Sequence, residues 1–286
     1  MGTFAPARVH LEHVMALYDP QQHRSHILLY GQDPGATSLY YAALALWYLG
    51  YPDQALQRSQ QAITLAQNLS HPYSLAFALE GMAELYQFRR EAQQTRERAE
   101  ALMTLSTEQR FACWLVSATV LRGWALAEHG QGAEGIAQIR QGLAAWQAMG
   151  EALYQPRFRA LLAELYGNIG QPEAGLSVLA EVLAEVHTNG LCYYEAELHR
   201  LKGMLQQAAG CDGEAEACFR QALDVARRQQ AKSWELRAAM SLSRLWQHQR
   251  KRTEAYELLA PIHGWFTEGF DTADLQEARE LVDVRV

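Results

Sequence analysis

A pattern of residues that returns every 40 positions sets the strongest limit on how this chain folds. Glycines occupy four places in a series with this spacing, and arginines occupy the other two: Gly50, Arg90, Gly130, Gly170, Gly210 and Arg250. Seven residues before each place stands a small residue: Ala43, Ala83, Gly123, Ala163, Gly203 and Ser243. Five residues after it stands a mostly small one: Ala55, Thr95, Gly135, Gly175, Ala215 and Ala255. A fixed period of this length is typical of a stack of repeated structural units.

The spacing has a physical cause if each unit is a pair of helices. Two helices pack closely only where side chains are small, and larger residues one turn away fill the flanking gaps. A glycine suits the left-handed turn that closes the first helix, and proline is favoured where the next helix begins, as at Pro52 and Pro172. We therefore predict six helical hairpins, with helices near 37–49 and 53–68, 73–88 and 91–106, 112–129 and 132–148, 155–169 and 172–188, 193–209 and 213–229, and 233–248 and 252–266.

The order of small, aromatic and bulky positions resembles the tetratricopeptide repeat, most closely in segments 44–56 and 163–176. The period departs from that family, whose usual unit has 34 residues. Units of 40 residues are similar to the repeat region of MalT-like bacterial transcription activators. Segments 17–24, 30–35 and 227–246 resemble the C-terminal repeats of large bacterial signalling proteins that carry a nucleotidyl-cyclase or DNA-binding domain and an NTPase. The resemblance implies an all-α fold, a right-handed α-solenoid of antiparallel helix hairpins.

Three segments are expected along the chain. Residues 1–36 contain a helix over Phe4–Tyr18 that has the pattern of the second helix of a hairpin but lacks a first helix as its partner. A linker from Asp19 to Gly35 follows it. Residues 37–271 form the six hairpins, and residues 272–286 form a C-terminal capping helix. The unpaired helix would expose an apolar edge, which natural solenoids avoid. We favour the explanation that the chain is the C-terminal part of a longer protein; the alternative is a homodimer through this helix.

Composition limits the possible functions. The formal charge of −7 argues against a nucleic-acid partner, and no run of about 18 apolar residues predicts a membrane span. The four cysteines form no Cys-x-x-Cys pair, which favours a reduced, cytoplasmic protein. No phosphate-binding loop, nucleophile elbow or calcium loop is present, so we expect no enzymatic activity and no cofactor. His10, His13, His23 and His26 are interpreted as solvated residues rather than as metal ligands.

The resemblance also places candidate binding residues. In tetratricopeptide stacks, certain positions of each first helix face the concave groove. Aromatic and acidic groups dominate the first three units, and arginines dominate the last two, which are residue types that anchor interfaces. The corresponding residues here are Tyr40, Trp47, Tyr48, Glu80, Glu84, Phe88, Trp124, Glu128, Arg157, Glu164, Asn168, Glu197, Arg200, Arg237, Arg244 and His248.

We predict a regulatory scaffold that binds a peptide, a partner domain or an effector on its concave face. Such a scaffold would be the C-terminal module of a larger bacterial signalling protein. Two alternatives stay open. The chain is a metabolite sensor whose ligand lies between Tyr40, Trp47 and Trp124, or it is a scaffold that assembles with copies of itself.

Overall fold

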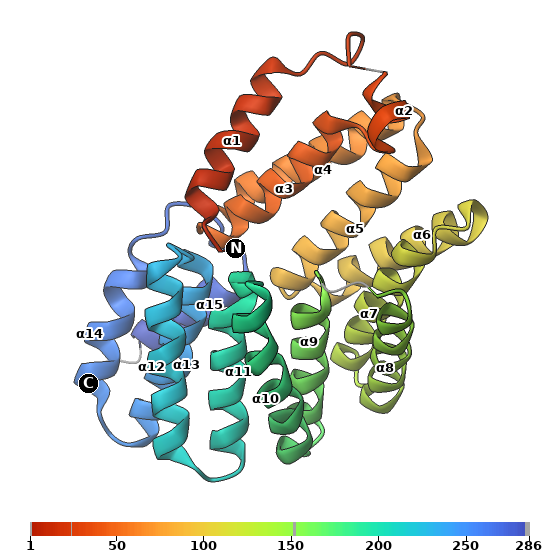
Figure 1. Cartoon of the computed structure of the whole chain (residues 1–286). Coiled ribbons are helices and arrows are strands. Elements are labelled where there is room, and N and C mark those ends of the chain that lie inside the picture. Colours follow the sequence, from red (N-terminus) through yellow and green to blue (C-terminus); the bar gives the residue numbers. More distant parts are fainter. Residues whose placement is uncertain (1, 24, 151–152, 284–286) are drawn as a thin grey trace. The chain divides into compact units, whose positions relative to one another are not determined.

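The computed structural model describes residues 2–23, 25–150 and 153–283, apart from the side chain of residue 187. Within these residues the chain is helical and contains no strand. The helices are α1 Phe4–Leu17, α2 His26–Tyr30, α3 Pro34–Tyr48, α4 Pro52–Asn68, α5 Pro72–Phe88, α6 Ala92–Gln109, α7 Ala112–Glu128, α8 Gly132–Ala148, α9 Gln155–Asn168, α10 Pro172–Asn189, α11 Glu195–Ala208, α12 Asp212–Arg228, α13 Lys232–His248, α14 Arg252–His263 and α15 Ala273–Asp283 (Figure 1). A short 3-10 helix, Cys192–Tyr194, precedes α11.

The chain divides into two compact units. One comprises Phe4–Trp47 and Tyr51–Gly150, and the other comprises Glu151–Val286 with two short pieces, Met1–Thr3 and Tyr48–Gly50. We call them the N-terminal unit and the C-terminal unit. In each unit the helices pack in chain order, α4 to α8 in the first and α9 to α14 in the second. The predicted all-α solenoid of helix hairpins is confirmed. The three-part division at residues 36 and 271 stays a prediction.

Left-handed residues close the helices at a spacing half that of the sequence pattern. The predicted series has positive φ throughout, from 62° at Arg90 to 90° at Gly50. A second series lies midway between these places and also has positive φ: Ser70, Arg110, Gly150, Gly190 and Gln230. From α4 to α13, therefore, each helix and its turn occupy 20 residues.

The turns that end the first helices share one hydrogen-bond pattern. The amide after the left-handed residue donates to the carbonyl five residues earlier, as from Gln171 to Tyr166 at 2.8 Å and from Lys251 to Trp246 at 2.8 Å. This 6→1 bond satisfies a carbonyl that the helix end would leave unpaired. It explains why glycine is favoured at the place, since glycine adopts positive φ without steric cost.

The small residues of the repeat lie where helices touch. A Cβ atom on Gly123 of α7 would come within 2.8 Å of the Gly135 carbonyl on α8, and one on Gly135 would come within 2.4 Å of the Gly123 carbonyl. Ala83, Ala163 and Ala215 are fully buried at equivalent positions. The hairpins therefore need small side chains at these crossings, as the spacing predicted.

The N-terminal segment differs from prediction in one respect. Helix α1 lies where it was expected, but the linker from Asp19 to Gly35 contains the short helix α2 and the first turn of α3. The Tyr18 hydroxyl donates to the Asp33 carboxylate at 2.8 Å, and the same carboxylate accepts from the Ala36 amide at 2.8 Å. Asp33 thus caps α3, with Pro34 as its first residue.

Candidate binding surface

The sixteen predicted residues lie on the first helices of the hairpins, and most are buried. Eleven have exposed fractions of 9% or less: Tyr40, Trp47, Tyr48, Glu80, Glu84, Phe88, Trp124, Arg157, Glu197, Arg200 and Arg237. Glu164 and Arg244 are half-buried, and Glu128, Asn168 and His248 are exposed at the last turns of α7, α9 and α13. We call these sixteen residues the inner-face residues. Their role in binding stays a prediction.

A buried polar cluster joins three first helices of the N-terminal unit. The Tyr40 hydroxyl of α3 lies 3.0 Å from Glu80 Oε2 and 3.2 Å from Glu84 Oε2, both on α5. From α7, the Ser117 hydroxyl donates to Glu80 Oε1 at 3.0 Å. Buried carboxylates are costly unless donors satisfy them, so this cluster holds equivalent positions of successive hairpins together.

The aromatic inner-face residues pack against other aromatic rings. Tyr40 lies 4.4 Å from Phe77 between ring centroids, and Trp47 stacks on Phe88 at 4.4 Å. Trp124 is 2% exposed. A metabolite placed between Tyr40, Trp47 and Trp124 would have to displace these core contacts.

In the C-terminal unit the inner face is built on arginines. Arg200 of α11 donates two hydrogen bonds of 2.7 Å to the Glu197 carboxylate, a bidentate pair. Burial lowers the pKa of Arg200, but the charge and hydrogen bonds of Glu197, together with the charges of Glu164 and Asp274, outweigh burial and leave the pKa above its ordinary value. Arg237 of α13 lies 3.6 Å from the same carboxylate. Arg157 of α9 is buried beneath its neighbour Phe158, with its guanidinium 4.9 Å from the ring centroid.

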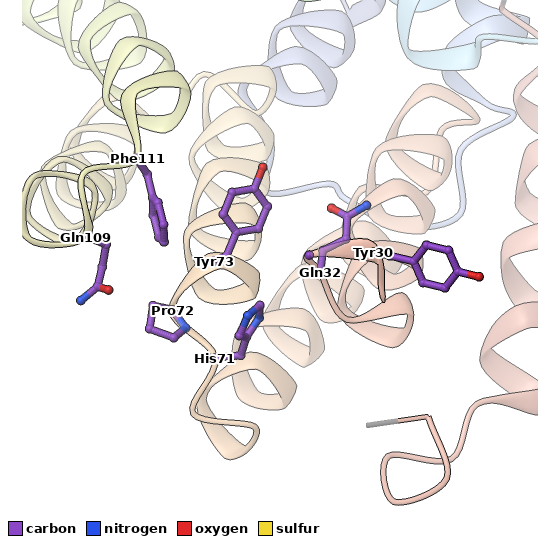
Figure 2. Close-up of a pocket in the computed structure, with 8 residues that line it drawn as sticks. Tyr30, Gln32, His71, Pro72, Tyr73, Gln109 and Phe111 are labelled. Carbon is purple, nitrogen blue, oxygen red and sulfur yellow. The ribbon is translucent and has the colours of Figure 1, made fainter. Parts of the chain in front are cut away.

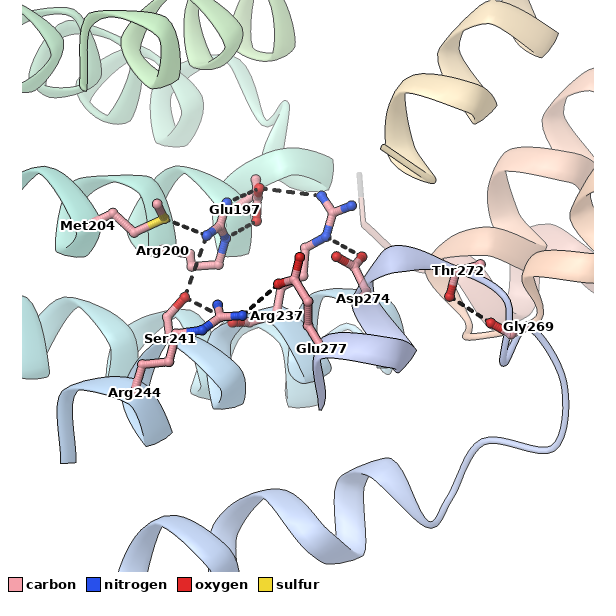
Figure 3. Close-up of polar contacts among 10 residues, drawn as sticks. All are labelled: Glu197, Arg200, Met204, Arg237, Ser241, Arg244, Gly269, Thr272, Asp274 and Glu277. Atoms are coloured by element: carbon pink, nitrogen blue, oxygen red, sulfur yellow. Dashed lines mark hydrogen bonds and ion pairs between the residues drawn. The ribbon is translucent and has the colours of Figure 1, made fainter. Parts of the chain in front are cut away.

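The last helix lies against these arginines (Figure 3). Arg237 pairs with Asp274 of α15 at 2.6 Å, and Arg244 pairs with Glu277 at 2.6 Å. The sequence predicted a capping helix here but did not reveal that its carboxylates would face the predicted basic positions. The sequence feature that could have indicated this contact is the series of acidic residues at Asp274, Glu277 and Glu280, which are spaced by three residues.

A separate pocket of about 520 Å³ opens in the N-terminal unit. Tyr30 and Gln32 line it beside α2, Gln109 and Phe111 line it between α6 and α7, and the start of α5 lies between them (Figure 2). Among the described residues that line it, none is acidic and none is a lysine or an arginine. Burial lowers the pKa of His71, the one basic group in the lining, and the charge of Asp33 opposes this only partly. The pocket therefore suits an uncharged group with hydrogen-bonding atoms. Sequence reasoning did not identify it.

The histidines and cysteines carry no assembled reactive group. The His23 imidazole bonds the backbone of Asp19, at 3.0 Å from its amide nitrogen. Across the described residues, no set of three or more His, Cys, Asp or Glu side chains is arranged to hold a metal ion. The four cysteines are free, and burial raises the pKa of the Cys218 thiol. A lone Ser–His pair, Ser74 Oγ and His71 Nδ1 at 2.8 Å, holds the start of α5, where Ser74 is 1% exposed.

Comparison with solved structures identifies the fold. A tetratricopeptide repeat protein from Parabacteroides merdae superposes with a TM-score of 0.53 over 98% of both chains, at 12% identity. The fold is that of tetratricopeptide-repeat proteins. The apo form of RapI gives a TM-score of 0.59 at 10% identity over 86% of this chain and 84% of its own. A signal-transduction ATPase of Pyrococcus horikoshii with a tetratricopeptide repeat sensor gives 0.53 at 10% identity, over 92% of this chain and 40% of its own.

Sequence comparison adds one relative. An uncharacterized protein of Rhizobium meliloti (strain 1021) is 26% identical over 233 residues, which are 81% of this chain and 23% of the relative. The chain therefore spans about a quarter of that protein's length. No protein-family model matches the chain. Among the helices of the described residues, none is both long and apolar enough to cross a membrane.

Proposed function

We propose that the chain is a protein-interaction scaffold that binds a peptide or a partner domain through its inner-face residues. The observation that carries the proposal is the repeated placement of equivalent first-helix residues at steps of 40, with mainly aromatic and acidic side chains in the N-terminal unit and arginine side chains in the C-terminal unit. In a solenoid each unit repeats the structure of the last, so equivalent residues occupy equivalent places in successive hairpins.

The exposed inner-face residues define where a partner makes first contact. Glu128, Asn168 and His248 end their helices and are open to solvent, whereas the inner-face residues earlier in the same helices are buried or half-buried. A partner therefore meets the last turns of the first helices before it meets the buried ion pairs. Those pairs fix the spacing between hairpins, which keeps the surface rigid and lowers the entropy cost of binding.

The chain is also proposed to be a module of a larger bacterial signalling protein, and not an enzyme in itself. Two comparisons support this: the Rhizobium relative is about four times as long as the matched region, and the Pyrococcus ATPase joins a tetratricopeptide repeat sensor to further domains. In such an arrangement the scaffold would bind a partner in the cytoplasm and pass the bound state to the attached domains.

The proposal is tested with a displayed library of random dodecapeptides. Peptides are selected on the full chain, and their Kd values are measured on Glu128→Arg and on a matched control, Glu108→Arg. Glu108 is an exposed glutamate near the end of α6, a second helix. We expect Glu128→Arg to change the affinity of selected peptides at least tenfold and the control to leave it unchanged. Peptides that respond only to Glu108→Arg, or a library that yields no binder, would count against an inner binding surface.

A small effector is a second candidate ligand, favoured by the pocket of Tyr30, His71 and Tyr73. Its lining combines aromatic rings with amide groups, the mixture that suits an uncharged polar molecule. The change Tyr73→Ala should abolish binding of any neutral metabolite found by calorimetry on the full chain, while Tyr256→Ala, at an exposed site on α14, should not. Equal loss in both variants would point away from the pocket.

A further inference from the structure

Helix α15 lies along α13 through a row of polar contacts. In chain order, Arg237 pairs with Asp274 and Arg244 pairs with Glu277 (Figure 3). Further along, the Gln247 amide donates to the Leu281 carbonyl at 3.2 Å. Because both numbers rise together, the two helices run in the same direction. The contacts extend over eleven residues of α13, from Arg237 to Gln247, and eight of α15, from Asp274 to Leu281.

An apolar stripe accompanies this row. Leu275 is 2% exposed and Ala278 is fully buried, and Leu281 and Val282 pack partly buried against the same core as Leu245. Glu280 and Asp283 are exposed on the other side of the helix. Helix α15 is thus an amphipathic, acidic helix, with carboxylates at positions i and i+3 and apolar groups at i+1 and i+4.

Helix α15 brings negative charge to a surface on which arginines predominate. Arg200, Arg237 and Arg244 contribute three positive charges to these contacts, and Glu197 contributes one negative charge. Among these four side chains there are two positive charges in excess, and Asp274 and Glu277 supply two negative ones, while the charge of Glu164 also acts on Arg200. An apolar cap would not need this match, so the arginines select the charge of the helix that binds them.

The attachment of α15 allows exchange. The helix has 11 residues, too few to stay folded in water without its contacts. The residues that join it to α14 include Gly269 in a left-handed conformation, φ 77°, and Phe270 at 55% exposure. A short tether of this kind holds its end at an effective concentration on the order of millimolar. A free helix replaces α15 only if its own concentration and affinity together exceed those of the tethered helix.

We propose that the arginine surface of α11 and α13 is a binding site for an acidic amphipathic helix of a partner protein, and that α15 is the resident helix that the partner displaces. The inference rests on the proposed scaffold function and names the chemistry of one partner. A matching partner helix has carboxylates three residues apart and an apolar residue directly after the first carboxylate. Displacement of α15 would give the chain two states, one closed by its own helix and one open to the partner.

The test uses a fluorescent peptide of residues 271–283 and the full chain. In Asp274→Arg/Glu277→Arg, the resident helix no longer matches the arginines, so we expect the peptide to bind at least tenfold more tightly than to the unchanged chain. Glu280→Arg is the matched control, because it makes the same change on the exposed side of α15 and should leave the affinity as it was. Adding Arg244→Glu to the double variant should remove most of the gain.

Each outcome decides the matter. Equal peptide affinity for the unchanged chain and a folded double variant would overturn the proposal. If the double variant does not fold, Glu277→Arg alone serves, since its pair is 41% and 32% exposed and its loss leaves the buried pair in place. A gain of less than twofold there would also overturn the proposal. Failure here, while library peptides still respond to Glu128→Arg, rejects the acidic helix and leaves the scaffold function standing.

Discussion

At the scale of single residues, buried charged and polar inner-face side chains pair with one another or with neighbouring side chains. Glu80, with no exposed surface, accepts from Tyr40 and Ser117, and Glu197 accepts from Arg200. The residue types were visible in the sequence, but their pairing was not, because it depends on which first helices stand side by side. Burial changes what a substitution does: removal of one member leaves a buried partner unsatisfied.

The change Tyr40→Phe tests the buried cluster. It removes a hydroxyl that lies within 3.2 Å of two buried carboxylates, so we expect the free energy of unfolding to fall by about 1–3 kcal/mol. Tyr256→Phe is the control, since Tyr256 is 51% exposed and should change stability by less than about 0.5 kcal/mol. Urea denaturation of both variants measures the difference. Equal effects would mean that the hydroxyl of Tyr40 stabilises nothing.

His71 makes stability depend on pH. Its ring accepts from the Ser74 amide at the start of α5, and burial lowers its pKa below the ordinary 6.5. Between the folded pKa and 6.5, the unfolded chain binds a proton more readily than the folded chain does. The contribution of His71 to the free energy of unfolding is therefore complete above pH 6.5 and is lost as the pH falls toward the folded pKa.

His71→Asn isolates this effect. Asparagine caps a helix without titrating, so the loss of stability between pH 7.5 and 5.5 should be smaller in the variant than in the unchanged chain. His10→Asn, at an exposed site on α1, should keep the full loss. Urea titrations at the two pH values give the comparison, and parallel curves for all three chains would contradict the assignment.

At the scale of elements, a left-handed residue at a regular spacing ends each helix of the repeat. Gly210 has φ 81° and nothing within 4 Å of a would-be Cβ, so its requirement is purely conformational. Arg250 holds the equivalent place with φ 63° despite its Cβ. The glycine series revealed the first-helix turns in the sequence. The second series stayed hidden because Ser70, Arg110 and Gln230 adopt the same conformation without being glycine.

Opposite substitutions at Gly210 and Arg250 should have opposite effects. Gly210→Ala introduces a Cβ in the left-handed region and should lower the free energy of unfolding by about 1–2 kcal/mol. Arg250→Gly removes that strain and, after the entropy cost of glycine, should raise it by about 0.5 kcal/mol. Thermal denaturation of the two variants and of the unchanged chain measures both changes. A Gly210→Ala variant that is more stable than the unchanged chain would contradict this account.

At the scale of the whole molecule, a one-dimensional repeat made the fold predictable. Local spacing fixes the helices, their turns and their close crossings, as at Gly123 and Gly135. The candidate surface was only partly predictable, because exposure depends on contacts far apart in sequence. Position within the repeat placed Arg237 and Arg244 on the inner side, but only the folded chain shows α15 against them.

The central claim is that partners bind along the first helices. Amide hydrogen exchange of the full chain, with and without a selected library peptide, tests it most directly. We predict slower exchange on peptide addition in the last turns of α7, α9 or α13, around Glu128, Asn168 or His248, with α6 and α8 unchanged. Protection confined to the second helices, with the first helices unaffected, would contradict the account.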